Sequence, residues 1–242
     1  MKNISETGHG INLSNFKLQI DHCIGFGGEY APDNTDLLIA NMNAQYDAGK
    51  ALHETVITAL QESKDPINQR ELLFDGLSKL VTRSLGYVKS TKLDKAFKLD
   101  AKGLANKIRG KSKAVKVGAD GLPDADQISN SHLSYVMRAE NLKAYISLVG
   151  STPLYATQVA GISLADLTAL WTEMDEMNKN IGNIIAPVAH ARIARNKALY
   201  NKANGILAIS VACKEYVKGL YGASSPEYRM ISGIRYRYLK IS

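Results

Sequence analysis

The sequence predicts an all-α fold, built as two tandem helical bundles from an internal duplication, with a short strand-like segment at the end of each copy. Three observations support this prediction: short matches recur between the halves of the chain, apolar residues follow helical spacing, and turn residues stop the helices at corresponding places. We expect a first bundle over residues 1–109, a linker over 110–127 and a second bundle over 128–242. The linker contains the turn-forming stretch 118–123.

The internal matches are short and lie at a nearly constant distance along the chain. They pair Asn15-Phe16-Lys17 with Asn141-Leu142-Lys143, Tyr30-Ala31 with Tyr155-Ala156, Leu73-Phe74 with Leu199-Tyr200, Tyr87-Val88-Lys89 with Tyr216-Val217-Lys218, and Ile108-Arg109 with Ile234-Arg235. The separations are 126, 125, 126, 129 and 126 residues. The longest one follows a turn in which the second half has three extra residues, 200–206 against 74–77. A duplication explains these matches, and chance similarity between amphipathic helices is the alternative.

The first copy contains a series of expected helices separated by turn signals. The glycine-rich stretch 25–28 ends a first helix and forms a turn. Capping side chains at 32–36 begin a long helix, which Pro66 restarts or kinks and which stops at residues 75–76. Its apolar face consists of Leu38, Met42, Gly49, Leu52, Val56 and Leu60. The remaining helices of this copy are expected over 77–89 and 92–109.

The second copy repeats this plan. A capping-box-like start at 163–166 begins a long helix, in which Pro187 occupies a role like that of Pro66. The helix stops before residues 204–205, and Pro226 at a first helical position begins the last helix. The apolar face of the long helix consists of Leu167, Leu170, Met174, Met177, Ile181, Ile184 and Ile185. Between the long helix and the last helix, a further helix is expected over 206–221.

Each copy ends in a segment with period-two alternation, which is typical of a β-strand. Residues 113–117 alternate basic with apolar side chains, and residues 235–241 alternate basic with aromatic or apolar ones. An isolated pair of strands is marginally stable, so these segments would pair with each other or with a neighbouring molecule. The alternative is a linker and a frayed basic tail.

The composition is that of an ordinary globular protein, with 45% hydrophobic and 22% charged residues. The polar start at residues 1–6 lacks the apolar stretch of a secretory signal, and no apolar run is long enough to span a membrane. Cys23 and Cys213 lie in different copies at positions that do not match, so we expect no disulfide framework but two small buried hydrophobic residues. The sequence therefore predicts a cytoplasmic protein without a membrane span.

No motif in the sequence indicates catalysis, a cofactor or a metal site. Residues 105–112 fit a relaxed phosphate-loop pattern, but a helix precedes them where that loop requires a strand. The glycines at 25–28 lack the spacing of a dinucleotide fingerprint. The five histidines form no ligand pair at helical spacing, and the pair Glu6 and His9 lies beside helix-weakening glycines. We therefore expect no enzyme, no cofactor and no metal.

The basic charge of the chain is concentrated in one segment. Residues 89–116 hold ten basic and two acidic residues, a charge of +8, which leaves −1 for the rest of a chain of net charge +7. The candidate binding residues there are Lys92, Lys95, Lys98, Lys102, Lys107, Arg109, Lys111 and Lys113. A second candidate set in the C-terminal tail is Arg235, Tyr236, Arg237, Tyr238 and Lys240. Such a surface could contact nucleic-acid phosphates, acidic lipid or an acidic face of another subunit, and a solvated lysine-rich face is the alternative.

The leading functional hypothesis is a non-catalytic structural or scaffolding protein that acts through protein–protein contacts. Its expected partner is itself, as a homo-oligomer or filament, because a duplicated bundle offers similar surfaces twice and the basic segment faces a mildly acidic remainder. The alternative is a protein that binds nucleic acid or another acidic polymer through residues 89–116 and the basic, aromatic tail. A third hypothesis, an enzyme or small-ligand carrier, would place its site between helices beside Trp171.

Overall fold

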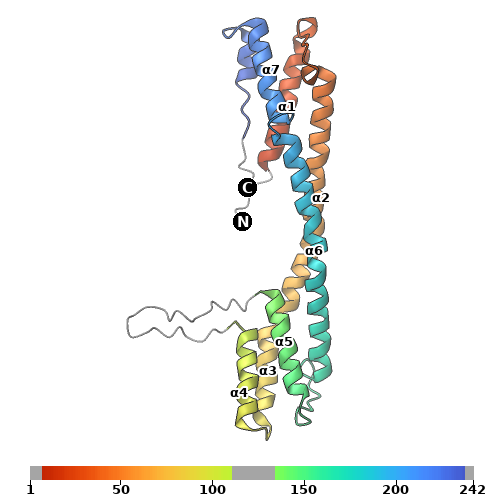
Figure 1. The fold of residues 1–242 in the computed structure, drawn as a ribbon, viewed down its shortest axis with the longest axis vertical. Helices are drawn as coiled ribbons and strands as arrows, with labels where there is room; N and C mark the ends of the chain where they lie inside the picture. Colours follow the sequence, from red (N-terminus) through yellow and green to blue (C-terminus); the bar gives the residue numbers. More distant parts are fainter. Residues whose placement is uncertain (1–6, 111–133, 238–242) are drawn as a thin grey trace, which may run out of the picture. The chain divides into compact units, whose positions relative to one another are not determined.

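The computed structural model describes residues 7–110 and 134–237, and within these ranges the chain forms helices and no β-strand (Figure 1). The all-α prediction is therefore confirmed for this part of the chain. The α-helices are α1 (Thr7–Gly25), α2 (Ile39–Asp75), α3 (Leu77–Ser90), α4 (Lys95–Ile108), α5 (Tyr135–Gly150), α6 (Leu164–Tyr200), α7 (Ile206–Tyr221) and α8 (Pro226–Ser232). The short 3-10 helices η1 (Gly27–Glu29) and η2 (Thr35–Leu37) lie between α1 and α2.

Several helix boundaries follow the expected capping residues. The side chain of Ser163 accepts a hydrogen bond from the backbone amide of Asp166 at 3.1 Å, as the capping-box-like start predicted. Ser225 caps α8 in the same manner, with proline at a first helical position. The helix expected from residue 92 begins later, because Asp94 is its cap and accepts from the amide of Phe97 at 2.7 Å.

The long helices run through their prolines. α2 continues through Pro66 and α6 continues through Pro187, so the restart expected at Pro66 does not occur. Because proline has no backbone N–H, each helix continues without one of its internal hydrogen bonds. α2 and α6 have the same length, 37 residues each.

The chain divides into two compact units, which we call the terminal unit (Met1–Ser63 with Ile185–Ser242) and the central unit (Lys64–Ile184). The terminal unit holds α1, α7, α8, the first part of α2 and the last part of α6. The central unit holds α3, α4, α5, the last part of α2 and the first part of α6. This division differs from the expected bundles at 1–109 and 128–242, because each unit takes helices from both ranges.

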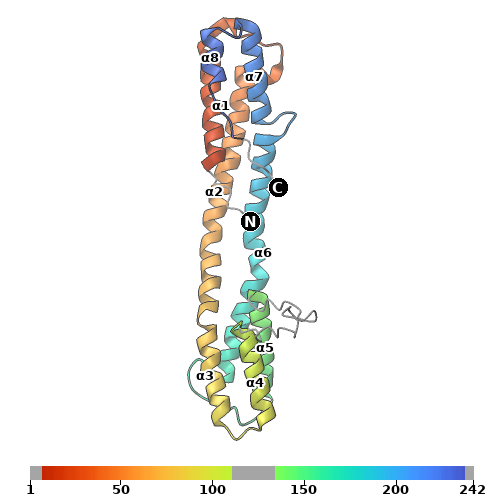
Figure 2. The same ribbon diagram turned by 90° about the vertical axis from the view of Figure 1, so that its left-hand side faces the viewer.

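In the central unit, α4 packs against both α3 and α5 (Figures 1 and 2). The small side chains of Ala101 and Ala105 on α4 are fully buried, which lets the neighbouring helix backbones approach. The buried core of this unit includes Phe74, Val81, Leu85, Val88, Ile108, Leu142, Tyr145, Val149, Leu167 and Met174. Leu167 and Met174 lie on the apolar face that helical spacing predicted for the long helix, whereas Ile185, expected on the same face, is 47% exposed.

In the terminal unit, α1 packs against α7 and α8. Its buried core includes Leu13, Phe16, Ile20, Met42, Leu199, Ile206, Ile209, Val217 and Ile231. Gly49 of α2 lies at a close approach, because a Cβ atom there would stand 2.7 Å from Cδ1 of Ile206 and 3.0 Å from Cδ2 of Leu13. A larger residue at position 49 would therefore displace the core side chains of α1 and α7.

The structure describes only part of the expected strand-like segments. Residues 113–117 and 238–241 lie outside the described residues. Residues 235–237 belong to no helix and no strand. Their backbone is held by side chains of α1, as described below.

Candidate functional site

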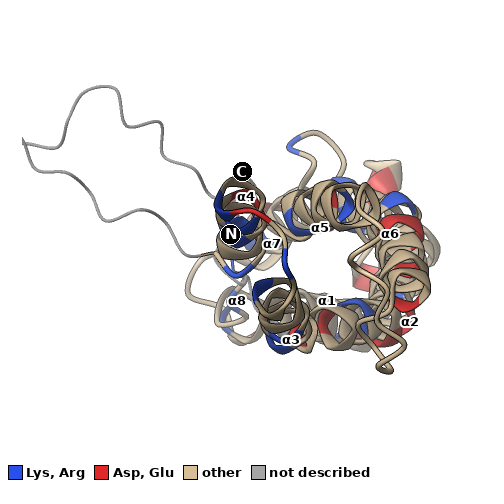
Figure 3. Ribbon diagram, turned by 90° about the horizontal axis from the view of Figure 1, so that it is seen from below, with Lys and Arg blue, Asp and Glu red and all other residues tan. Residues whose placement is uncertain are grey.

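The α3–α4 hairpin is the most basic surface of the described chain. Residues 77–109 carry nine basic side chains and two acidic ones, while residues 206–235 of the α7–α8 hairpin carry four basic and two acidic ones. Figure 3 shows the lysines and arginines of α3 and α4 in blue. Lys92, Lys95, Lys102 and Lys107 are exposed there. The part of the predicted charge concentration that the structure describes, residues 89–109, thus lies on one helical hairpin.

Two of the predicted patch residues are engaged inside the hairpin. The ammonium of Lys98 donates to the carbonyl of Thr91 at 2.6 Å, which ties the start of α4 to the preceding turn. The guanidinium of Arg109 donates to the hydroxyl of Thr82 at 3.2 Å and to the side chain of Asn106 at 2.8 Å. Arg109 therefore joins the end of α4 to α3, and the exposed part of the expected face consists of lysines. Lys111 and Lys113 lie outside the described residues.

An exposed leucine lies within this basic face. Lys95, Leu99 and Lys102 are spaced by four and three residues on α4, so they share one side of the helix. Leu99 is 55% exposed. This face therefore presents an apolar side chain between two cations.

The C-terminal segment is fastened to α1 by two asparagines. The side chain of Asn12 donates to the carbonyl of Arg237 and accepts from its amide, both at 2.8 Å. Asn15 donates to the carbonyl of Arg235 at 2.7 Å. Because these two bonds engage the amide and the carbonyl of one residue, the side chain of Asn12 replaces the partner that a neighbouring strand would have provided.

The aromatic ring of the tail is turned toward the protein. Tyr236 packs against the core of the terminal unit, and its hydroxyl donates to the side-chain carbonyl of Gln19 at 2.6 Å. Burial raises the pKa of Tyr236 above its usual range. Arg235 and Arg237 are exposed, while Tyr238 and Lys240 lie outside the described residues.

A buried tyrosine organises the terminal unit. The hydroxyl of Tyr30 donates to the carbonyl of Leu37 at 2.9 Å, which closes the loop that precedes α2. The same oxygen lies 3.6 Å from Sγ of Cys213 on α7. The ring of Tyr30 meets that of Tyr216 edge to face, with 5.3 Å between centroids.

The central unit contains the same arrangement at the matching positions. The hydroxyl of Tyr155 donates to the carbonyl of Ile162 at 2.6 Å and lies 2.6 Å from Oγ of Ser84 on α3. The rings of Tyr155 and Tyr87 meet edge to face, with 5.3 Å between centroids. Because Tyr155 uses its proton on Ile162, Ser84 donates to Tyr155 and accepts from Tyr145, whose hydroxyl lies at 2.9 Å. Burial raises the pKa of Tyr145 to about 12.

The two cysteines meet in the terminal unit. Sγ of Cys23 on α1 lies 3.4 Å from Sγ of Cys213 on α7, and both residues are buried. The expected burial of both thiols is observed, but their adjacency could not be predicted from positions 190 residues apart.

A cluster of polar side chains lies near the start of α1. Nδ1 of His9 lies 2.8 Å from the hydroxyl of Tyr200, and the side chain of Asn12 donates to the same hydroxyl at 3.2 Å. The ring of His53 on α2 lies 6.4 Å from that of His9. The histidines show no ligand spacing along the sequence, and the fold brings the rings of His9 and His53 near each other. No group of three or more possible metal ligands is found among the described residues.

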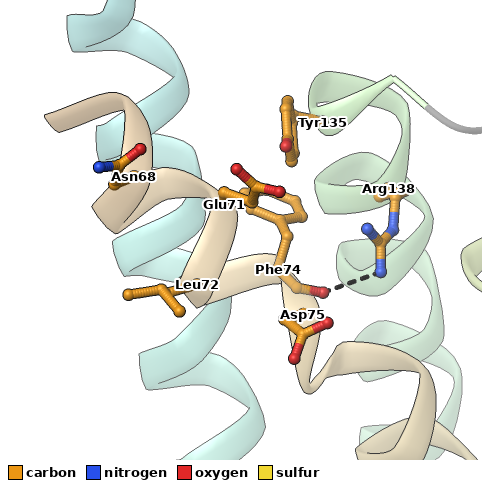
Figure 4. Close-up of a pocket in the computed structure, with 7 residues that line it drawn as sticks. All are labelled: Asn68, Glu71, Leu72, Phe74, Asp75, Tyr135 and Arg138. Carbon is orange, nitrogen blue, oxygen red and sulfur yellow. Dashed lines mark hydrogen bonds between the residues drawn. The ribbon is translucent and has the colours of Figure 1, made fainter. Parts of the chain in front are cut away.

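A shallow hollow with a volume of about 450 Å³ opens in the central unit between α2 and α5 (Figure 4). Its lining residues are Asn68, Glu71, Leu72, Phe74, Asp75, Tyr135 and Arg138. Leu72 at its edge is 74% exposed. The guanidinium of Arg138 donates to the carbonyl of Phe74 at 3.0 Å, and the rings of Phe74 and Tyr135 meet edge to face. The hollow thus combines apolar and aromatic side chains with two exposed carboxylates, those of Glu71 and Asp75.

Comparison with known proteins identifies no relative. No family model matches the chain, and searches of curated proteins and of solved structures find no significant match. None of the helices in residues 7–110 and 134–237 combines the length and the apolar character that crossing a membrane requires.

The hydrogen-bond clusters around the hydroxyls of Tyr30 and Tyr155, which we call the tyrosine nodes, allow a matched test of the two cores. Tyr155→Phe should lower the free energy of unfolding by roughly 1–3 kcal/mol, because it removes a buried hydroxyl that two polar groups use. Tyr30→Phe should cost a similar or smaller amount, since a thiol is a weak hydrogen-bond partner. Urea unfolding followed by circular dichroism measures both changes.

Tyr87→Phe is the control, because its ring makes the same edge-to-face contact while no hydrogen bond of its hydroxyl contributes to the node. Its free energy of unfolding should stay within about 0.5 kcal/mol of the wild-type value. Equal losses for Tyr87→Phe and Tyr155→Phe would contradict the role given to the Tyr155 hydroxyl.

Proposed function

We propose that this chain is a non-catalytic structural or scaffolding protein that acts through protein–protein contacts and associates with copies of itself. One observation carries the proposal: the central unit presents two surfaces of complementary character. The first is the face of α4 with Leu99 between Lys95 and Lys102, and the second is the hollow with its apolar edge and two carboxylates. Tyrosine and arginine, which the hollow contains as Tyr135 and Arg138, are among the residues enriched where protein interfaces are strongest.

In the proposed contact, Leu99 of one copy enters the hollow of another copy against Leu72 and the half-buried Tyr135. The lysines that flank Leu99 then lie near the carboxylates of Glu71 and Asp75. Because the two surfaces differ, the contact is heterologous and repeats from copy to copy, which favours a ring or a filament over a closed dimer. The ionic part of the contact guides association and weakens as salt rises.

We also propose that the two units descend from a tandem duplication in which the copies exchanged helices. The support is the matched tyrosine nodes: Tyr30 and Leu37 recur as Tyr155 and Ile162, 125 residues later. The hydroxyl of each tyrosine also meets a side chain from the other half of the chain: Tyr30 meets Cys213, and Tyr155 meets Ser84. In each unit, the tyrosine of one copy thus meets a helix of the other copy.

Charge reversal tests the proposed self-association. The double variant Lys95→Glu, Lys102→Glu should lower the association constant by roughly 10-fold or more, because two attractive contacts become repulsive. The variant Glu71→Lys, Asp75→Lys should weaken association equally, and a mixture of the two variants should associate again. Light scattering on a sizing column across protein concentrations measures these changes.

The control variant Lys79→Glu, Lys89→Glu makes the same charge change elsewhere on the hairpin and should associate like the wild type. A wild-type protein that remains monomeric at high concentration and low salt would contradict the proposal. Unchanged association of the Lys95 and Lys102 variant would exclude the α4 face as the contact.

Binding of nucleic acid or another acidic polymer is the second candidate function, favoured by the nine basic side chains on the α3–α4 hairpin. Fluorescence anisotropy with a labelled single-stranded oligonucleotide should then show affinity that falls steeply with salt, because bound phosphates release counterions. Here Lys79→Glu, Lys89→Glu should weaken binding as much as the α4 variant, since each phosphate contact contributes. A salt-independent affinity, or an effect of the α4 variant alone, would exclude this candidate.

A further inference from the structure

The thiol pair joins the two ends of the chain at the centre of the terminal unit. Cys23 of α1 and Cys213 of α7 have exposed fractions of 1% and 0%, and their sulfur atoms are 3.4 Å apart. A disulfide bond requires about 2.05 Å between sulfurs, so the atoms need to approach by about 1.4 Å. Side-chain rotation and small helix shifts provide movements of this size.

The central unit shows that the node does not require thiols. Ser84 occupies the position that matches Cys213, 129 residues earlier, and it forms the corresponding contact with a tyrosine hydroxyl. Val149 occupies the position that matches Cys23, 126 residues later, and is fully buried. A serine and a valine therefore complete an equivalent core, and the close pair of sulfurs is particular to the terminal unit.

The surroundings distinguish the two sulfurs chemically. The pKa of Cys213 is lowered to about 7, chiefly by a hydrogen bond from the Cys23 thiol, against the opposing effect of burial; the charge of Lys214 makes a smaller contribution in the same direction. The same bond raises the pKa of Cys23. We therefore assign the first attack to Cys213, because the thiolate is the nucleophilic form of cysteine and the pKa of Cys213 is the one that is lowered.

We propose that Cys23 and Cys213 form a reversible disulfide, which makes the terminal unit a site of oxidative modification that links α1 covalently to α7. The oxidant belongs to the class of small disulfides, with oxidised glutathione as the probe. The Cys213 thiolate attacks one glutathione sulfur, so a mixed disulfide forms and one glutathione thiolate leaves. Cys23 loses its proton to solvent and attacks the sulfur of Cys213, which releases the second glutathione thiolate.

In this reaction two protein thiols are oxidised to a disulfide and one glutathione disulfide is reduced. The two protons that the protein thiols lose are taken up by the two glutathione thiolates, so the products are the protein disulfide and two glutathione thiols. The product closes a loop between residues 190 positions apart, which restricts the unfolded chain and stabilises the folded one. Because both sulfurs are buried, the first attack proceeds through local opening of the unit.

The test measures the thiol–disulfide equilibrium of the full-length protein in glutathione buffers, once under native conditions and once in concentrated urea. Equilibrium is approached from the reduced and from the oxidised protein, with refolding from urea so that burial does not limit the reaction. Acid quenching, alkylation and mass spectrometry count the free thiols. The equilibrium constant for the disulfide should be roughly 100-fold larger in the native state than in urea.

Cys213→Ser is the matched control, because it places in the terminal unit the residue that the central unit has at position 84. This variant should fold, keep one thiol and show no change of Tm with oxidant, while oxidation should raise the wild-type Tm by roughly 5 °C or more. Equal equilibrium constants in native buffer and urea would overturn the proposal. So would glutathione adducts on both cysteines, or disulfides formed only between chains.

Discussion

A buried tyrosine hydroxyl must find hydrogen-bond partners, and in each unit this requirement joins three separate segments. Tyr155 fixes the loop before α6 through the carbonyl of Ile162 and reaches α3 through Ser84. Tyr30 fixes the loop before α2 and reaches α7 through Cys213. In each unit the tyrosine lies in the loop before a long helix. It holds that loop together and connects it to a helix from the other half of the chain, so it positions the long helix and the second helix relative to each other. The remaining helices of each unit pack around the core to which this tyrosine belongs.

Each node joins both halves of the chain, and neither compact unit is one half of the sequence. The terminal unit combines the ends of the chain, and the central unit is the continuous stretch Lys64–Ile184. Because the terminal unit combines both ends of the chain, Cys23 lies beside Cys213 and the asparagines of α1 lie beside the C-terminal segment. The proposed thiol chemistry and the fastening of the tail are both consequences of this arrangement.

Local signals predicted helix type and many helix ends, because capping side chains and glycines act within a few residues. Ser163, Ser225 and Gly205 lie where helices begin. The residues of the predicted long-helix faces are buried or half-buried, except for Leu38 and Ile185, which are exposed. Periodicity shows that a helix face is apolar but not which helix covers it. The packing of helices from the two halves of the chain within one unit was therefore not predictable. The engagement of Lys98 and Arg109 was missed for the same reason, since their partners lie on the turn and on α3.

The most direct test of this account compares two fragments by circular dichroism and urea unfolding. The fragment 64–184 contains every helix segment of the central unit and the complete Tyr155 node, so it should be helical and unfold cooperatively. The fragment 1–109 is the expected first sequence copy, and it lacks the α7 partner of Tyr30 and the α5 partner of α4. It should show weak helicity without a cooperative transition. Cooperative folding of 1–109 together with failure of 64–184 would contradict the account.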